Sequence, residues 1–200
     1  MTFAVGDHTR LLEVTRPAIM DYADGHGYDY LEPAGLQCDR PPSWWKVPLL
    51  LKALESYDEV LWIDCDVAIV DGGADIASAV SADAVQAMVI HRTPEGDVPN
   101  LGVWLVRRGM RDWLRVMWEM TGYVGHPWWE QAAMLDLLGY LHDPRPSVHV
   151  RDTELFGDTC FLPLEWNSHE QNDRHPHPRF AHVTPNSVDW RIPILERYLA

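Results

Sequence analysis

Two aspartates separated by one residue are the feature of this sequence most suited to chemistry. Asp64 and Asp66 lie within a largely apolar run that extends over positions 59–70. Residues two apart in a strand point to the same side, so the two carboxylates can present paired oxygen ligands of the kind that Mg2+ and Mn2+ accept. A divalent cation would also offset the cost of burying two negative charges. We interpret the pair as a metal site.

The acid pair also has a simpler interpretation, in which the strand ends near residue 63 and both acids are solvated turn residues. Asp71-Gly72-Gly73 offers a more natural turn, which favours the metal site. Three kinds of enzyme carry such a pair at a strand end: glycosyltransferases that use nucleotide sugars, nucleotidyltransferases, and phosphatases with an aspartate nucleophile. The pair alone does not distinguish among them.

Strands and helices that alternate along the chain must position this pair. Hydrophobic periodicity predicts strands over residues 3–6, 28–31, 60–70, 85–90 and 103–106, and near residues 148 and 180. It predicts helices over residues 11–22, 43–57, 110–120, 128–138 and 189–199. This order is typical of an α/β sandwich with a mostly parallel central sheet flanked by helices. No linker or repeat interrupts it, so we expect one domain over residues 1–200.

Composition narrows the class of protein. With 46% hydrophobic and 23% charged residues, the chain is neither disordered, collagen-like nor a coiled coil. Its 16 Lys and Arg against 30 Asp and Glu give a formal net charge of −14. Such a surface repels phosphate backbones and anionic lipid, so we expect no nucleic acid partner.

Cysteine usage and hydropathy bear on location. The three cysteines, Cys38, Cys65 and Cys160, are far apart, so they form neither a CxxC metal site nor an even disulfide framework. No apolar run reaches the roughly 18 residues of a membrane span. The first residues lack the basic start and apolar block of a signal peptide. We therefore expect a soluble, cytoplasmic protein without a membrane span.

Five motifs in a fixed order over residues 20–184 add context to the acid pair. They are Trp44-Trp45-Lys46, Asp64-Cys-Asp66, Asn100-Leu-Gly, Pro127-Trp128-Trp129-Glu130-Gln131 and Phe180-Ala-His182. In this order the sequence resembles the galactosyl/xylosyl/mannosyl transferase family of retaining GT-A glycosyltransferases, which have a DxD motif. The resemblance implies a GT-A-like (nucleotide-diphospho-sugar transferase) fold.

The resemblance also implies roles for the residues that bind the metal and the donor. Asp64 and Asp66 become the DxD pair, with Asp64 nearer the nucleotide ribose or a metal-bound water and Asp66 a direct ligand. His182 becomes the third protein contact to the metal, Mn2+ or Mg2+, and Lys46 faces the donor diphosphate. Because adjacent carboxylates repel each other, we also expect Asp66→Ala to leave the metal-free protein at least as stable as the wild type.

A second group of residues lies, by the same resemblance, near the transferred sugar or the acceptor. Asn100, Glu130 and Gln131 belong to it. Gln131 would steady the positive charge that develops at the anomeric carbon, and Glu130, where the family often has aspartate, would bind hydroxyl groups. We regard both as catalytic candidates, although an acid in the first turn of a helix is stabilised by the helix dipole without any catalytic role.

Several tryptophans could stack on a sugar, because an indole face packs against the apolar face of a sugar ring. The chain has 10 tryptophans. Trp128 and Trp129 stand next to Glu130, and Trp44 and Trp45 stand next to Lys46, so these four are the candidates for substrate contacts. Trp62, inside the apolar run, is expected in the core.

The function that we expect is transfer of a sugar from a nucleoside diphosphate sugar, with UDP-sugars favoured, to an acceptor hydroxyl on a small molecule or glycan, with retention. One alternative is a sugar-phosphate nucleotidylyltransferase, although residues 4–10 are a poor version of its glycine-rich loop. Another is a DxD phosphohydrolase with Asp64 as nucleophile and Asp66 as acid and base, whose motif normally opens the chain. A third is a noncatalytic carbohydrate-binding module.

Overall fold

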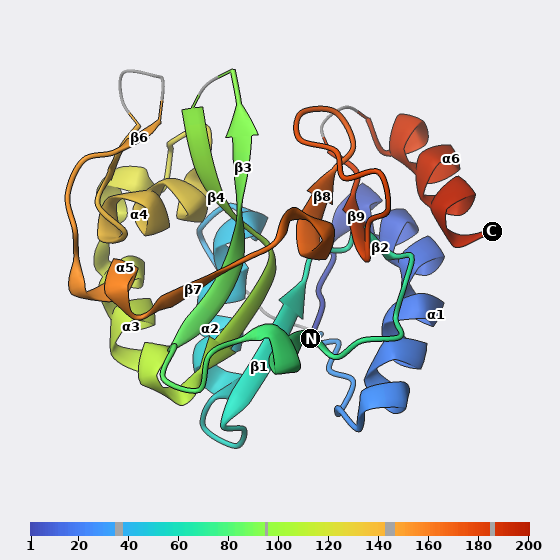
Figure 1. Ribbon diagram of the computed structural model, residues 1–200, viewed down its shortest axis with the longest axis horizontal. Coiled ribbons are helices and arrows are strands. Elements are labelled where there is room, and N and C mark those ends of the chain that lie inside the picture. The colour runs from blue at the N-terminus through green and yellow to red at the C-terminus, as the bar shows by residue number, and fades with distance from the viewer. Residues whose placement is uncertain (35–37, 95, 143–146, 185–186) are drawn as a thin grey trace.

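The central element of the computed structural model is a four-stranded sheet (Figure 1). The structure describes residues 1–34, 38–94, 96–142, 147–184 and 187–200. The strands lie in the order β1 (Glu59–Ile63), β4 (Gly96–Arg107), β3 (Gln86–Thr93) and β7 (Thr159–Leu162). β4 runs antiparallel to β1 and β3, whereas β3 and β7 are parallel. The sheet is therefore mixed.

A smaller sheet stands beside the central one and brings distant parts of the chain together. It consists of β2 (Val67–Ile69), β9 (Phe180–His182) and β8 (Ser168–His169), with β9 in the middle. β9 pairs antiparallel with β2 and parallel with β8. A separate two-stranded pair joins β5 (Tyr140–Leu141) to β6 (Val148–His149).

Helices cover both sides of the central sheet (Figure 1). The α-helices are α1 (Thr9–His26), α2 (Lys46–Ala53), α3 (Arg111–Glu119), α4 (Trp129–Leu137), α5 (Glu154–Gly157) and α6 (Val188–Leu199). Short 3-10 helices are η1 (Gly6–His8), η2 (Pro42–Trp45), η3 (Ile76–Ala79), η4 (Arg108–Met110), η5 (Thr121–Tyr123) and η6 (Leu164–Asn167). Helices α1 and α6 pack on each other and on β2. Helices α2, α3 and α4 lie together on the other side.

Two hydrophobic cores result, one on each face of the central sheet. Leu61 and Ile63 of β1 belong to the core beneath α1 and α6, whereas Val60 and Trp62 belong to the core beneath α2, α3 and α4. Strand side chains alternate between faces, so a strand buried on both faces must be apolar throughout. This explains the continuous apolar run before Asp64.

The structure confirms the α/β class and most predicted elements, and corrects three predictions. First, the sheet is mixed rather than mostly parallel, because β3 and β4 follow each other directly, with Thr93 paired to Gly96. A connection that short can join only antiparallel strands.

Second, residues 3–6 and 28–31 are not strands. The amino group of Met1 donates to the Leu61 carbonyl oxygen at 2.8 Å, and the Thr2 N–H donates to the Leu31 carbonyl oxygen at 3.0 Å. The segments that contain Met1 and Leu31 are thus linked to each other and to β1, but no strand is assigned to either.

Third, the predicted strand over residues 60–70 is two strands in two different sheets. β1 ends at Ile63 and β2 begins at Val67. The Asp64 N–H donates to the Gly102 carbonyl oxygen at 2.7 Å, and the Val67 N–H donates to the Asp64 carbonyl oxygen at 3.1 Å. The acid pair therefore lies in a turn between sheets, and this turn, rather than strand alternation, sets the positions of the two carboxylates.

Among the described residues, no helix combines the length and the apolar character needed to cross a bilayer.

Two buried histidines pack where the two sheets meet. His91 of β3 and His169 of β8 are 2% and 6% exposed, with ring centroids 5.3 Å apart. His91 Nε2 lies 2.6 Å from the Asn167 carbonyl oxygen, and His169 Nδ1 accepts from two backbone N–H groups. Burial lowers the pKa of His91 to about 4 and that of His169 to about 3. Both rings are therefore neutral in the folded protein near pH 7.

This pair predicts a loss of stability in mild acid. Below about pH 6.5 the histidines of the unfolded chain gain protons that the folded chain does not accept, so each lowers the unfolding free energy by about 1.4 kcal/mol per pH unit. The loss ends near the folded pKa values. Urea unfolding at a series of pH values from 7 to 4.5 gives the unfolding free energy as a function of pH. Its slope should be smaller in His169→Asn than in the wild type, whereas His177→Asn, at an exposed histidine, should match the wild type. Equal slopes in both variants would contradict this account.

Candidate active site

A cavity of about 650 Å3 opens beside the turn that joins β1 to β2. Its volume lies within the range of small-molecule sites. Every site residue predicted from the sequence lines it except Trp44 and Trp45; the lining includes Lys46, Asp64, Asp66, Asn100, Trp128, Trp129, Glu130, Gln131 and His182. Five separate parts of the chain thus converge on one cavity.

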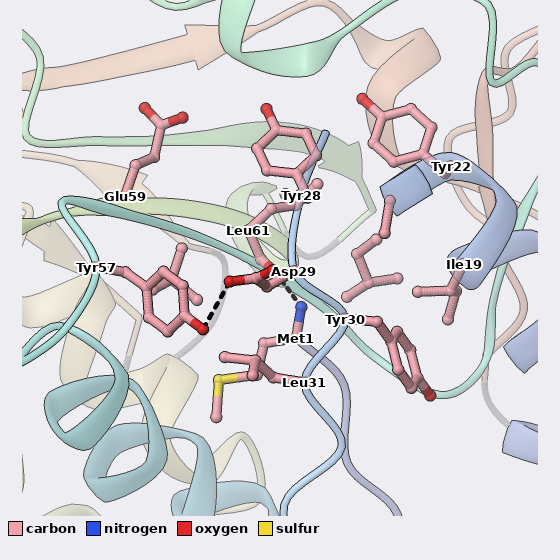
Figure 2. Close-up of a pocket in the computed structure, with 13 residues that line it drawn as sticks. Met1, Ile19, Tyr22, Tyr28, Asp29, Tyr30, Leu31, Tyr57, Glu59 and Leu61 are labelled. Carbon is pink, nitrogen blue, oxygen red and sulfur yellow. Dashed lines mark hydrogen bonds between the residues drawn. The ribbon is translucent and has the colours of Figure 1, made fainter. Parts of the chain in front are cut away.

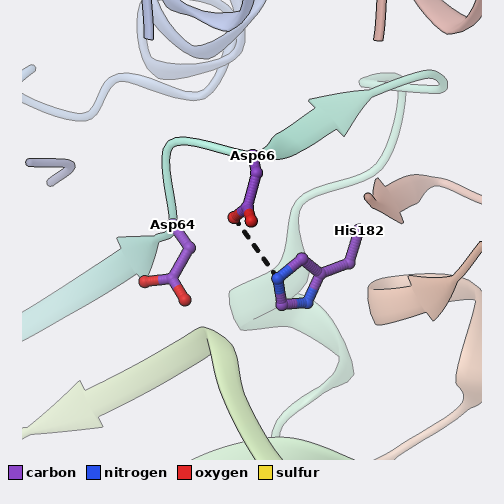
Figure 3. Close-up of side chains that lie close together, drawn as sticks. All are labelled: Asp64, Asp66 and His182. Carbon is purple, nitrogen blue, oxygen red and sulfur yellow. Dashed lines mark ion pairs between the residues drawn. The ribbon is translucent and has the colours of Figure 1, made fainter. Parts of the chain in front are cut away.

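The acid pair and His182 form a three-residue cluster (Figure 3). Ligand atoms of Asp64, Asp66 and His182 all lie within 4.8 Å of one another. His182 ends β9 and is paired in register with Val67 of β2, which places its ring beside the turn. Two carboxylates and an imidazole form a donor set that suits Mn2+, and carboxylates also bind Mg2+. The residues present therefore fit a divalent cation.

Asp66 is buried and held by two partners. Its Oδ2 accepts from Arg191 Nη1 at 2.7 Å, and its Oδ1 lies 3.3 Å from His182 Nε2. Burial alone would raise the pKa of Asp66, but His182 and Arg191 outweigh it and hold the pKa at about 2. The sequence-based expectation for Asp66→Ala is therefore wrong in its premise: the carboxylate is attracted by its neighbours, and its removal leaves a largely buried arginine without its acid.

Lys46 links Asp64 to Glu130 in the lining of the cavity. Its Nζ lies 3.2 Å from Asp64 Oδ1 and 3.0 Å from Glu130 Oε1, and the lysine and the glutamate are each 4% exposed. Burial lowers the pKa of Lys46, but the two carboxylates outweigh it and raise the pKa overall. Burial raises the pKa of Glu130. Lys46 thus stays cationic and positions both acids.

Trp62 has a role that its place in the apolar run does not reveal. The side chain is 3% exposed, as expected for the core, yet its indole N–H donates to Asp64 Oδ1 at 2.6 Å. Trp62 and Asp64 are two residues apart, which is the spacing that puts side chains on one side of a strand. The tryptophan therefore orients the first acid of the pair.

An irregularity in β4 lies beside Asp64 and contributes Asn100 and Gly102 to the lining of the cavity. Ala87 of β3 is paired with Leu105, but Val89 is paired with Asn100, so residues 101–104 of β4 face a single residue of β3. The Leu101 N–H donates to Gln131 Oε1 at 3.4 Å instead. Bulges of this kind are common next to active sites because they redirect polar groups.

The tryptophans divide into two pairs. Trp128 and Trp129 line the cavity, and Trp129 is 45% exposed with a φ of 47°, a left-handed conformation that is uncommon for a bulky residue. Trp44 is fully buried in the core, and Trp45 donates its indole N–H to the Arg40 carbonyl oxygen at 2.7 Å. Neither lines the cavity, so their position does not support the predicted sugar contacts.

Sequence reasoning missed several residues that lie at this site. Arg191 reaches Asp66 from α6, 125 residues along the chain. Asn167, which is fully buried, contacts both His182 and Asn100. Gly102 leaves space for His182: a Cβ there would lie 2.2 Å from His182 Cε1. Only the glycine carries a local signal, as an isolated glycine in a strand pattern marks a bulge or close approach.

A second cavity, between α1 and β1, is much smaller (Figure 2). Its volume is about 50 Å3, and its lining includes Tyr22, Tyr28, Tyr30 and Tyr57. That volume holds only a few water molecules, so it does not compete with the larger cavity as a substrate site.

No family model matches the sequence, and no curated protein is a significant match. Solved structures do match. A glycosyltransferase involved in the glycosylation of the major capsid of PBCV-1 aligns over 98% of this chain and 97% of its own, with a TM-score of 0.73 and 16% identity. The chain has a GT-A glycosyltransferase fold.

Two structures of LgtC share this GT-A fold. The galactosyltransferase LgtC in complex with donor and acceptor sugar analogs aligns over 99% of this chain and 93% of its own, with a TM-score of 0.58 and 14% identity. An active-site mutant of LgtC, with glutamate in place of glutamine, aligns over 99% and 94%, with a TM-score of 0.60 and 12% identity. At such identities the likeness is one of fold.

Gly102→Ala should disturb this site more than its small size suggests. The new Cβ would lie 2.2 Å from His182 Cε1 and 2.9 Å from Asn100 Oδ1. Hydrogen bonds hold both of these side chains in place, so they cannot simply move aside. We therefore expect a loss of about 1–3 kcal/mol in unfolding free energy, measured by urea denaturation. Gly122→Ala, where a Cβ meets open space, is the control and should stay within about 0.5 kcal/mol of the wild type. Equal stability of the two variants would show that His182 is not confined by β4.

Proposed function

We propose that this protein is a metal-dependent glycosyltransferase that moves a sugar from a nucleoside diphosphate sugar to an acceptor hydroxyl with retention of configuration. The observation that carries the proposal is one cavity that combines the Asp64, Asp66 and His182 cluster with buried cations and with Gln131. The fold of known glycosyltransferases around that cavity supports it. A UDP-sugar is our first candidate for the donor.

Asp64, Asp66 and His182 are the residues that would hold Mn2+ or Mg2+. Their two carboxylates and imidazole supply ligands without rearrangement of the backbone, since the turn and β9 already bring them together. A cation held by these residues would neutralise the negative charge that develops on the departing diphosphate.

Two cationic side chains of the cavity suit an anionic donor. Lys46 and Arg191 line it, and Arg191 Nε is buried without a hydrogen-bond partner among the described residues. A buried donor left unpaired is costly, and a phosphate oxygen would satisfy it. We propose that both residues bind the diphosphate. They explain how a chain with a net charge of −14 can take up an anion.

Retention requires that the acceptor attacks from the face that the nucleotide leaves. In our proposal the bond from the anomeric carbon to the phosphate oxygen breaks, the acceptor oxygen bonds to that carbon, and the acceptor proton passes to the departing phosphate. Gln131 lines the cavity as an uncharged amide that can steady the developing positive charge. Glu130 is paired with Lys46 at 3.0 Å, which suits a positioning role better than that of a nucleophile. The LgtC active-site mutant shows that a glutamine belongs to that enzyme's active site, which supports the role of Gln131.

The exposed ring of Trp129 and the neighbouring Trp128 would stack on a sugar at the mouth of the cavity. The similar structures favour this transferase over the sugar-phosphate nucleotidylyltransferase and the phosphohydrolase. A carbohydrate-binding module would have no need of the acid pair, in which Asp66 is buried.

Donor binding should depend on metal and on Asp66. The donor can be sought in a thermal-shift panel of UDP-galactose, UDP-glucose, UDP-xylose and GDP-mannose, each with and without Mn2+. The sugar nucleotide that is the donor should raise the melting temperature by a few degrees, and only when metal is present. Asp66→Asn should abolish that rise and lower the melting temperature of the free protein, because Arg191 loses its acid. Asp83→Asn, at an exposed acid, is the control. Undiminished donor binding in excess chelator would rule out the metal site.

The product should keep the anomeric configuration of the donor. Proton NMR of the first product from an α-linked donor should show the small coupling constant of an α-glycoside. Gln131→Ala should lower kcat at least tenfold with little change in donor affinity, because an interaction that strengthens in the transition state appears in the rate. Glu130→Gln should keep measurable activity. A β-linked product would instead make Glu130 a general base.

A further inference from the structure

Side-chain hydrogen bonds connect His182 to Gln131 through two asparagines. His182 Nδ1 lies 3.1 Å from Asn167 Oδ1, Asn167 Nδ2 donates to Asn100 Oδ1 at 2.8 Å, and Asn100 Nδ2 donates to Gln131 Oε1 at 3.1 Å. The four residues come from β9, η6, β4 and α4. We call this series the amide relay. It runs from the cluster of possible metal ligands to the proposed sugar site.

Backbone groups of β4 determine the direction of the amide relay. The Gly102 N–H donates to Asn100 Oδ1 at 2.9 Å, and the Leu101 N–H donates to Gln131 Oε1 at 3.4 Å. A peptide N–H can only donate, so the side-chain atoms that face these groups must be oxygens. Asn100 therefore turns its oxygen toward the amide nitrogen of Asn167. Asn167 in turn can offer only its oxygen to His182.

This direction decides which nitrogen of His182 carries the hydrogen. Nδ1 must donate to Asn167 Oδ1, so in the neutral ring Nε2 keeps its lone pair. Nε2 is the atom that faces Asp66, at 3.3 Å from Oδ1. A lone pair that faces a carboxylate is favourable only with a metal ion between the two, so this tautomer with a free Nε2 lone pair belongs to the metal-bound site. Asn167 itself is fully buried, and its own carbonyl oxygen is held by His91 Nε2 at 2.6 Å. Its position is therefore fixed from both sides.

We propose that Asn167 is a positioning residue that holds His182 as the Nδ1–H tautomer, with Nε2 directed to the metal, and that takes its own orientation from Asn100 and β4. The inference rests on the proposed function, since the metal ligands belong to it. Groups that orient a metal-binding histidine typically contribute about 10- to 100-fold to metal affinity. This is the size of effect that Asn167 should have.

Substitutions at Asn167 separate its two hydrogen bonds. Asn167→Leu keeps the branched shape of the side chain but removes both, so we expect Mn2+ affinity, measured by titration calorimetry, to fall by about 10- to 100-fold. Asn167→Asp keeps the oxygen that accepts from His182, so Mn2+ should bind at least as tightly as in the wild type. Asn172→Leu, at an exposed asparagine of the next loop, is the matched control and should change nothing.

Nitrogen-15 NMR of the histidine rings tests, without any metal, whether His182 Nδ1 carries a hydrogen. Two-bond correlation spectra in mildly alkaline buffer, with the His182 signals assigned from His182→Gln, should show a hydrogen on Nδ1 in the wild type and in Asn167→Asp. Asn167→Leu should lose it. Asn100→Leu should lose it in part, because Asn167 is then free to turn its amide over, whereas Asn100→Asp keeps the acceptor and should retain it.

The calorimetry and the NMR together decide the role of Asn167. Asn167→Leu with the wild-type tautomer and with Mn2+ affinity within about threefold would overturn the proposal. If circular dichroism shows that Asn167→Leu does not fold, Asn167→Ala takes its place in the titration calorimetry and the nitrogen-15 NMR. A wild-type protein that binds no Mn2+ contradicts the proposed function, while the hydrogen on His182 Nδ1 still decides whether Asn167 orients the ring.

Discussion

Asp66 carries its charge where water barely reaches, and the surrounding side chains follow from that constraint. A buried carboxylate must be paired, because isolation of an ion in the interior costs several kcal/mol or more. Here the partners are Arg191 from the last helix and His182 from the smaller sheet. Each can reach Asp66 only if α6 and β9 dock against the turn after β1. The same contacts that satisfy the charge therefore assemble the cavity.

The balance of charge also explains how several ionised side chains coexist in one cavity. Lys46 pairs with Asp64 and Glu130, and Arg191 pairs with Asp66. Three acids thus meet two permanent cations, and the imidazole of His182 contacts Asp66 as well. The balance leaves the site close to neutral, and both cations line the cavity. A site of this kind can exchange one of its internal pairs for a bound ion or phosphate without exposing an isolated charge.

Much of the fold was predictable, because a sheet buried on both faces leaves an uninterrupted apolar run and helices leave a period of their own. The acid pair, His182 and Gln131 could be predicted to lie together for a related reason, since their residue types and order along the chain carry the signal, and all of them line the one cavity. Arg191 and Asn167 could not be found in this way. Each acts through tertiary packing, and an arginine in a helix or an asparagine in a short connecting segment has no local pattern that distinguishes it from a solvated residue. The break between β1 and β2 was missed because both strands are apolar and join without a glycine or proline.

The irregular stretch of β4 has a consequence for how this chain can vary. Strand residues alternate between two faces, so a change of one residue in strand length reverses the face of everything beyond it. Loss of a single residue between Asn100 and Leu105 would keep the β1 side of the strand in place but would turn Asn100 away from α4 and into the opposite core. Within this short stretch, the number of residues is therefore a stricter requirement than their identity, and insertions or deletions should be far less tolerated than exchanges of one apolar side chain for another.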